Sequence, residues 1–161
     1  MKKIAICLAM LSVAILGAAI SSASDTDTVS CTATFTQLGV TVSPNNYDFG
    51  FGQANDWSNT SGGYFEVQNT GNNNEKIYIE ASADAGNTWT LAATNGENQA
   101  VMKCLGGDLT SWTSIHTQQT LKSNLASGAT VDFDLAFQFP SSTTTYDTQY
   151  FTVTVTAVAA S

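Results

Sequence analysis

The residues that could perform acid–base or nucleophilic chemistry are few in this chain of 161 residues. His116 is the only histidine, and no serine or cysteine stands near it in a nucleophile elbow or triad motif. Asp132 and Asp134 offer the paired carboxylates that glycoside hydrolysis uses, but their spacing places both on the outward side of a predicted strand. Because a complete set of acid, base and nucleophile is missing, we expect no enzymatic activity.

Two cysteines offer redox chemistry. Cys7 lies in an apolar N-terminal run that we expect to be removed, which leaves Cys31 and Cys104. In an exported chain such a pair is usually oxidised. We expect a Cys31–Cys104 disulfide, which would close a loop of roughly 70 residues and stabilise the fold by about 3–4 kcal/mol. Two alternatives stay open: both thiols are free and buried, or the bridge joins two chains.

Metal chemistry has little support in the sequence. A single histidine and an oxidised cysteine pair argue against a zinc site. Acidic positions such as Asp25, Asp27, Asp56 and Asp84 leave a structural calcium ion open, although no EF-hand spacing is present. We therefore expect no cofactor, with calcium as the alternative.

Three tryptophans are the remaining candidates for a binding site. Flat aromatic rings with polar neighbours suit the faces of sugars. Trp57 is surrounded by asparagine, aspartate and serine, and Trp112 lies near a predicted strand end. Trp89, inside a Thr-Trp-Thr-Leu run, is expected in the core of the fold. Trp57 and Trp112 are therefore the predicted ligand-binding residues.

The first 24 residues resemble a secretory signal peptide. Lys2 and Lys3 precede an apolar run from Ile4 to Ile20, and small residues follow it. The run is short for a membrane span, and no basic stop-transfer cluster comes after it. We expect cleavage after Ala23 or Ser24, one domain over residues 25–161, and a secreted, cell-surface or periplasmic location without a remaining membrane span.

Charge excludes several classes of partner. The formal charge is −8, and removing the two N-terminal lysines leaves 3 lysines against 13 acidic residues, a charge of −10. A surface this acidic, without a basic patch, repels nucleic acids and anionic membranes. Only 11% of all residues are charged, so the surface must be rich in uncharged polar groups.

Period-two alternation of apolar and polar residues predicts an all-β chain. No stretch beyond the N-terminal run shows a sustained helical period. Eight to nine short strands separated by turns predict a single Ig-like antiparallel β-sandwich. A polar loop is predicted at residues 53–63, and residues 64–68 and 76–82 are expected to pair as a hairpin. The other predicted strands are residues 29–42 with a bulge at Gln37 or Gly39, 47–51, 88–91, 100–105, 131–139 and 150–158, with a strand-like stretch at 112–121.

Two segments carry a resemblance to a known family. Residues 42–50, Val-Ser-Pro-Asn-Asn-Tyr-Asp-Phe-Gly, and residues 64–72, Tyr-Phe-Glu-Val-Gln-Asn-Thr-Gly-Asn, resemble the opening of ASPM–SPD-2–hydin modules. The resemblance implies an Ig-like fold in a structural or adhesive setting and no catalytic residues. The overall layout is also similar to secreted filament subunits, which pair an N-terminal strand with a neighbouring subunit.

Two uncharged segments favour self-association. Residues 29–42 and 150–158 are long and rich in threonine and small apolar residues, and unprotected strand edges of this kind invite pairing with another chain. The alternative is that both are ordinary strands of one closed sandwich. We therefore expect an exported structural or adhesive protein, a subunit of an assembly formed by strand pairing. The other function that we expect is a secreted carbohydrate-binding module using Trp57 and Trp112.

Overall fold

The computed structural model of the chain describes residue 30 and residues 32–160. The predicted signal peptide and Cys31 lie outside these described residues. The chain divides into two units after Thr34. In the first unit the described residues are exposed and belong to no strand. The strands of the described chain all lie in the second unit, residues 35–161.

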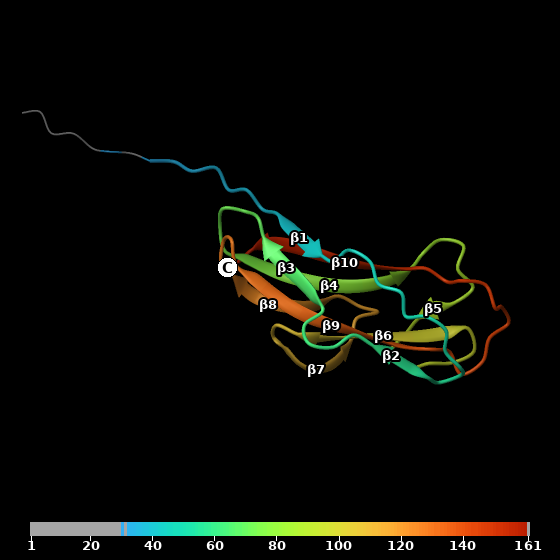
Figure 1. Cartoon of the computed structure of the whole chain (residues 1–161). Coiled ribbons are helices and arrows are strands. Elements are labelled where there is room, and N and C mark those ends of the chain that lie inside the picture. Colours follow the sequence, from blue (N-terminus) through green and yellow to red (C-terminus); the bar gives the residue numbers. More distant parts are fainter. Residues whose placement is uncertain (1–29, 31, 161) are drawn as a thin grey trace, which may run out of the picture. The chain divides into compact units, whose positions relative to one another are not determined.

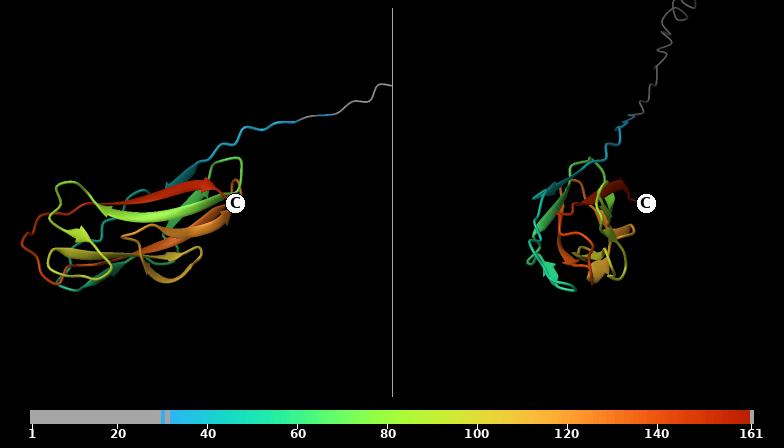
Figure 2. Two further views of the ribbon diagram at one scale, coloured as in Figure 1. Left: turned by 180° about the vertical axis from the view of Figure 1, so that it is seen from behind. Right: turned by 90° about the vertical axis from the view of Figure 1, so that its right-hand side faces the viewer.

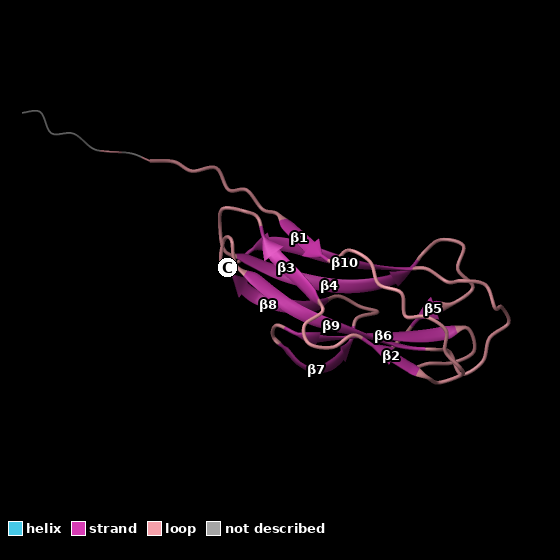
Figure 3. Cartoon of the chain, in the orientation of Figure 1, coloured by secondary structure: helices cyan, strands magenta, loops and turns pink. Residues whose placement is uncertain are grey.

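The described part of the second unit contains ten strands and no helix (Figure 3). The predicted all-β class is confirmed, with one or two strands more than expected. Accordingly, no helix among the described residues has the length and apolar character needed to cross a membrane. The strands are β1 (Val40–Ser43), β2 (Trp57–Asn59), β3 (Phe65–Asn69), β4 (Glu75–Ala83), β5 (Thr90–Leu91), β6 (Gln99–Gly106), β7 (Leu109–Ser114), β8 (Gln119–Leu125), β9 (Thr130–Gln138) and β10 (Phe151–Ala159).

The strands form the two sheets of a sandwich (Figures 1 and 2). The larger sheet has the order β1-β3-β9-β6-β5, and β2 and β7 extend it by pairing with β9 and β6. The smaller sheet has the order β10-β4-β8. Among the strand pairs of the described chain, only β5 and β6 run parallel, so the predicted antiparallel arrangement is correct apart from this short pair.

The core lies between the two sheets and follows from the alternation along the strands. On β9, Phe133, Leu135 and Phe137 point inward and are buried. On β4, Ile77 and Ile79 are fully buried in the same cluster. Burying a side chain of this size contributes about 1.5–3 kcal/mol. These inward rows therefore hold the sheets together.

The predicted hairpin between residues 64–68 and 76–82 is wrong. β3 pairs with β1 and β9, whereas β4 lies in the smaller sheet. The β3–β4 turn therefore carries the chain from one sheet to the other. Asn69 fixes this crossing, because its buried amide nitrogen donates to the carbonyls of Asn73 and Leu125, both at 2.9 Å.

Other predicted elements also need correction. Of the strand predicted at residues 29–42, the described part forms a strand only in β1. Residues 47–51 form no strand: the rings of Tyr47 and Phe49 pack on Phe65 and Phe137 of the larger sheet, and Phe51 is fully exposed. The polar loop predicted at residues 53–63 contains β2, and residues 112–121 separate into the end of β7 and the start of β8.

Candidate functional site

The arm root, which we define as residues Phe35–Gly39, leads into β1. Asn72 in the β3–β4 turn holds it through three hydrogen bonds. The Asn72 Nδ2 donates to the carbonyl of Phe35 at 2.7 Å, and Gln37 N donates to the Asn72 Oδ1 at 2.9 Å. The backbone N of Asn72 donates to the Gln37 carbonyl at 3.0 Å. The backbone of the root is thus fixed, while the Phe35 side chain is 89% exposed.

A buried carboxylate fixes the end of the arm root. Glu75 is fully buried, and its Oε1 accepts a hydrogen bond from Gly39 N at 2.8 Å. Its Oε2 has no hydrogen-bond partner among the described residues, which is costly for a buried polar atom. Gly71 makes the close packing possible, since a Cβ there would lie 2.5 Å from the Gln37 carbonyl oxygen. Glu75 and Gly71 together hold the root against the β3–β4 turn.

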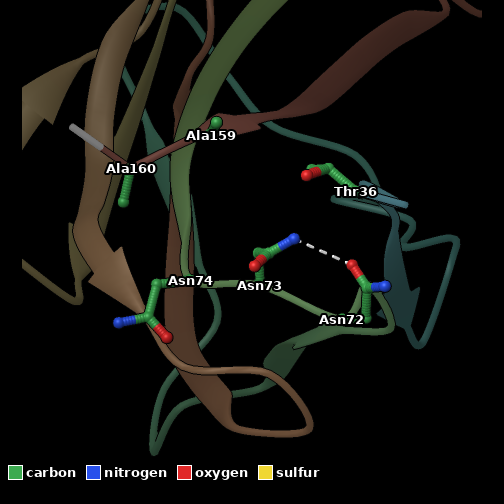
Figure 4. Close-up of a pocket in the computed structure, with 6 residues that line it drawn as sticks. All are labelled: Thr36, Asn72, Asn73, Asn74, Ala159 and Ala160. Carbon is green, nitrogen blue, oxygen red and sulfur yellow. Dashed lines mark hydrogen bonds between the residues drawn. The ribbon is translucent and has the colours of Figure 1, made fainter. Parts of the chain in front are cut away.

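A pocket of about 430 Å³ lies beside the arm root (Figure 4). No titratable side chain lines it, so the pocket has no acid–base pair for catalysis. Its lining shows instead that the arm root and the C-terminal end of β10 border the same pocket. The lining residues are Thr36 of the root, Asn72, Asn73 and Asn74 of the β3–β4 turn, and Ala159 and Ala160.

β10 is an edge strand of the smaller sheet and pairs only with β4 in the described chain. Its inward side chains are half-buried, whereas Ile77 and Ile79, the residues of β4 that face inward beside them, are fully buried. β1, at the edge of the larger sheet, contacts β10 and also has half-buried inward valines. We name this row of half-buried residues the open seam: Val40, Val42, Phe151, Val153, Val155 and Ala157.

The opposite edge of the smaller sheet, β8, is covered by the β6–β7 turn. Asp108 N donates to the Leu121 carbonyl at 2.8 Å, and Ser123 N donates to the Asp108 Oδ2 at 2.8 Å. The Lys122 Nζ lies 2.7 Å from the Asp108 Oδ1. Hydrogen bonds from Lys122 and Ser123 lower the pKa of Asp108 to about 2. This carboxylate is therefore charged at neutral pH and occupies the edge of β8.

The two tryptophans predicted to bind a ligand lie on the outer face of the larger sheet. Lys103 on β6 places its Nζ 5.0 Å from the centre of the Trp57 ring. Ser114 on β7 is opposite Lys103, and Trp112 is two residues before Ser114, so it points to the same side. Trp57 is 46% exposed and Trp112 is 37% exposed. We name Trp57, Lys103 and Trp112 together the aromatic face.

Two apolar residues support the aromatic face from below. Ala136 is opposite Lys103, and Val101 belongs to the same row as Trp57. Both are buried but do not belong to the core cluster between the sheets. The side chains of the outer face therefore cover them, which gives this face a partly apolar base.

Asp134 fixes the connection that leads from β2 to β3. Its carboxylate accepts hydrogen bonds from Gly63 N at 2.9 Å, Tyr64 N at 3.1 Å and Thr60 Oγ1 at 2.8 Å. Burial raises the pKa of Asp134, but these three hydrogen bonds outweigh burial and hold the pKa below its ordinary value. The ionised carboxylate thereby positions the strand that carries Trp57.

Trp89 is placed as predicted. It is half-buried and packs against the core, with its ring edge-to-face on Phe139 at a centroid distance of 6.2 Å. Its Nε1 donates to the Thr143 Oγ1 at 2.8 Å. Trp89 is therefore a structural residue with a satisfied polar atom.

Cys104 lies on β6, and its fully buried thiol has no disulfide partner among the described residues. Burial, with the charge of Asp134 as a second cause, raises the pKa of this thiol to about 12. Cys31 lies outside the described residues, so the Cys31–Cys104 disulfide stays a prediction. Such a bridge would require residue 31 to enter the core beside β6.

Ser114 and His116 form a contact that the sequence did not suggest. The Ser114 Oγ lies 2.9 Å from the His116 Nδ1. Within the described chain no carboxylate accepts a hydrogen bond from His116, so the pair lacks the third member that orients the imidazole in a triad. The contact is local, between residues two positions apart.

The acidic positions considered for calcium are occupied by local hydrogen bonds where the structure describes them. Asp56 accepts from Gln53 N at 2.8 Å, and Asp84 accepts from the Thr152 Oγ1 at 2.7 Å. Among residues 30 and 32–160, no group of three or more His, Cys, Asp or Glu side chains could hold a metal ion. Asp25 and Asp27 lie outside the described residues, and calcium stays a prediction.

Sequence reasoning missed the residues that position the arm root and complete the aromatic face. Asn72 indicated only a turn, and nothing in the pattern showed that Glu75 is buried. Lys103 could have been identified, because it is the only charged residue of the strand predicted at residues 100–105. Comparisons with family models, with curated proteins and with solved structures find no match to this chain, so the residues and their geometry alone support a function.

Proposed function

We propose that the chain is a subunit of an extracellular assembly, in which the N-terminal segment of one copy adds a strand to another copy. The observation that carries the proposal is that this segment has the pattern of a strand but no strand partner among the described residues. Val29, Cys31, Ala33 and Phe35 alternate with serine and threonine as in a strand, yet its described residues pair with no sheet. Export belongs to the proposal through the signal-like residues 1–24.

The exposure of Phe35 gives the segment a reason to dock. This ring is 89% exposed, and full burial of a phenylalanine contributes about 1.5–3 kcal/mol. Residues 29–38 contain no charge. Because the processed subunits are acidic and repel one another, an uncharged contact segment is the least costly one to bring against a second copy.

Removing the segment tests the proposal. We expect the processed chain, residues 25–161, to form oligomers or filaments in sedimentation velocity and negative-stain electron microscopy. A chain of residues 37–161 should remain monomeric with an unchanged circular dichroism spectrum. A folded but strictly monomeric 25–161 chain would overturn the proposal, and so would equal assembly of the shortened chain.

Carbohydrate binding is a second candidate, favoured by the aromatic face. Trp57 and Trp112 are exposed on one side of the same sheet, with Lys103 between them. Two indoles on a sheet face supply apolar surfaces on which sugar rings stack, and the ammonium supplies a donor for hydroxyl groups. This function does not require assembly, and the two candidates are independent.

Affinity electrophoresis in gels that contain soluble polysaccharides tests the second candidate. Trp57→Ala and Trp112→Ala should each remove a retardation shown by the native protein, without changing its oligomeric state. Tyr146→Ala is the matched control, because Tyr146 is 97% exposed outside the aromatic face. Equal retardation of the native protein and both tryptophan variants would exclude the aromatic face as the site.

A further inference from the structure

We infer that residues 29–36 of one copy bind as a strand to the free edge of β10 in a second copy, antiparallel to β10. The inference rests on the proposed function and names the surface that receives the segment. It also assigns the direction in which the two strands pair.

The inward side of β10 is incompletely buried. Val155 faces inward beside Ile79 of β4 and is only half-buried, although Ile79 is fully buried. The same contrast holds for Ala157 beside Ile77. A strand added beside β10 would cover these side chains and pair the backbone groups that β4 leaves free.

The donor segment, residues 29–36, matches the acceptor strand β10 in length, charge and pattern. Residues 29–36 span about 27 Å as a strand, and the nine residues of β10 span about 31 Å. Both are free of charge. Each presents an apolar row on one face and mostly hydroxyl groups on the other, where Val158 is the exception in β10, so the added strand would continue both faces of the smaller sheet. The apolar rows are Val29, Cys31, Ala33 and Phe35 in the donor and Phe151, Val153, Val155 and Ala157 in the acceptor.

The other strand edges of the described sheets do not fit the donor segment. β8 has its edge covered by Asp108 and the β6–β7 turn. β7 is uncharged, but its inward side offers only one apolar residue, Leu109, followed by Ser111 and Thr113. β5 has two residues and β2 has three. β1 has four residues and borders the open seam itself.

The position of the arm root gives the direction of pairing. Thr36 of the root and Ala159 and Ala160 at the end of β10 line the same pocket, so the root leaves the sandwich at that end of β10 (Figure 4). In a head-to-tail row of equally oriented copies, the next copy lies beyond the Ala159 end of the first. The segment leaves the first copy at that end, so it reaches the next copy at the opposite end of β10, near Phe151. Phe35 then lies closest to Phe151, and the residues before it extend toward Ala157. This order is antiparallel.

Disulfide trapping between two different variants tests both the surface and the direction. In a Cys31→Ser background, molecules with Thr34→Cys are mixed as monomers with molecules that carry a cysteine on β10. Paired residues of neighbouring strands lie within the distance range that a disulfide spans. Upon assembly under mild oxidation, we expect the Thr34→Cys chain to form a disulfide cross-link with the Thr152→Cys chain. The Thr156→Cys chain should form no such cross-link. Thr110→Cys is the control, because it places the cysteine at an exposed position on another edge strand, β7.

Each outcome supports or overturns the inference. A dominant cross-link to position 152 supports it. A dominant cross-link to position 156 shows parallel pairing, and one to position 110 shows another acceptor, so either result overturns it. Assembly without any of these cross-links overturns the inference and leaves the proposed function intact, whereas absence of assembly in the native chain removes both. If Cys31→Ser alone abolished assembly, association would depend on a disulfide through Cys31, and this result would also overturn the inference.

Discussion

The two edges of the smaller sheet, β8 and β10, differ in how their backbone is protected. At β8, the turn after β6 supplies a backbone hydrogen bond from Asp108 to Leu121 and a salt bridge to Lys122. At β10, no charged residue occurs along the strand, and its inward row is only half-buried. Natural sheets usually protect their edges with charges or covering turns. One edge is therefore bonded to a turn of its own chain at Leu121 and Ser123, whereas the other keeps a half-buried apolar row with no neighbour beyond it in its sheet among the described residues.

The largest effect is expected when β10 is given a charge that points inward. In the single chain, Val155→Lys leaves the ammonium at a half-buried edge position from which it reaches solvent. A strand docked on β10 would bury that charge, so assembly should be lost in sedimentation velocity. The control is Thr154→Lys on the outward face of the same strand, which should still assemble. Equal loss in both variants would contradict the role of the inward row.

Truncating the exposed aromatic ring of the arm root should weaken assembly without abolishing it. Phe35→Ala removes a side chain that we expect to be buried upon docking, so the concentration at half-maximal assembly should rise about tenfold or more. Phe51→Ala is the control, because Phe51 is fully exposed outside the arm root. Light scattering over a concentration series measures both variants. An unchanged concentration at half-maximal assembly for Phe35→Ala would show that this ring lies outside the interface.

Burial of the Cys104 thiol in the core should make the free energy of unfolding fall at alkaline pH. The folded pKa of Cys104 is about 12 against an ordinary value of 9.0, so the unfolded chain loses this proton first as the pH rises. The stabilising contribution is complete below pH 9 and is lost between about pH 9 and 12, at no more than about 1.4 kcal/mol per pH unit. Urea unfolding of the native chain and Cys104→Ala from pH 8 to 10.5 measures it. The same slope in both proteins would show that this thiol does not titrate as described.

The smallest effect is expected from weakening the protection of β8. Asp108 has a folded pKa of about 2 against an ordinary value of 3.8. Its contribution is therefore present above pH 3.8 and is lost as the pH falls toward 2. Since the pair with Lys122 is one-third exposed, Asp108→Asn should reduce the free energy of unfolding by only about 0.5–1 kcal/mol. Thermal unfolding at pH 7 and pH 2.5 should show a difference at pH 7 that becomes smaller at pH 2.5.

The sequence predicts those strands whose side chains alternate between core and solvent. β9 and β10 were found in this way because Phe133 or Val155 marks the inward row without any knowledge of neighbours. The strand pattern of residues 29–39 is equally clear, but a strand needs a hydrogen-bonding neighbour, and the pattern does not say whether that neighbour belongs to the same chain. The crossing at Asn69 was missed because an asparagine-rich turn gives the same signal for a hairpin and for a passage between sheets.

The candidate sites depend on register more than on residue type. Trp57 and Trp112 were recognisable from their polar neighbours, but their common face with Lys103 follows only from strand pairing. The contact of Glu75 with Gly39 joins residues 36 positions apart. No local pattern encodes such a pair.

The fixed arm root has a consequence for growth. In the proposed assembly, each subunit has its strand leaving at one end and its acceptor along one edge, so the polymer would have two unlike tips, one offering a bare β10 and the other an undocked segment. Addition at the two tips then proceeds through different encounters and at different speeds. A synthetic peptide with the sequence of residues 29–36 would fill the first tip without presenting a new acceptor, and would act as a chain terminator at substoichiometric concentration.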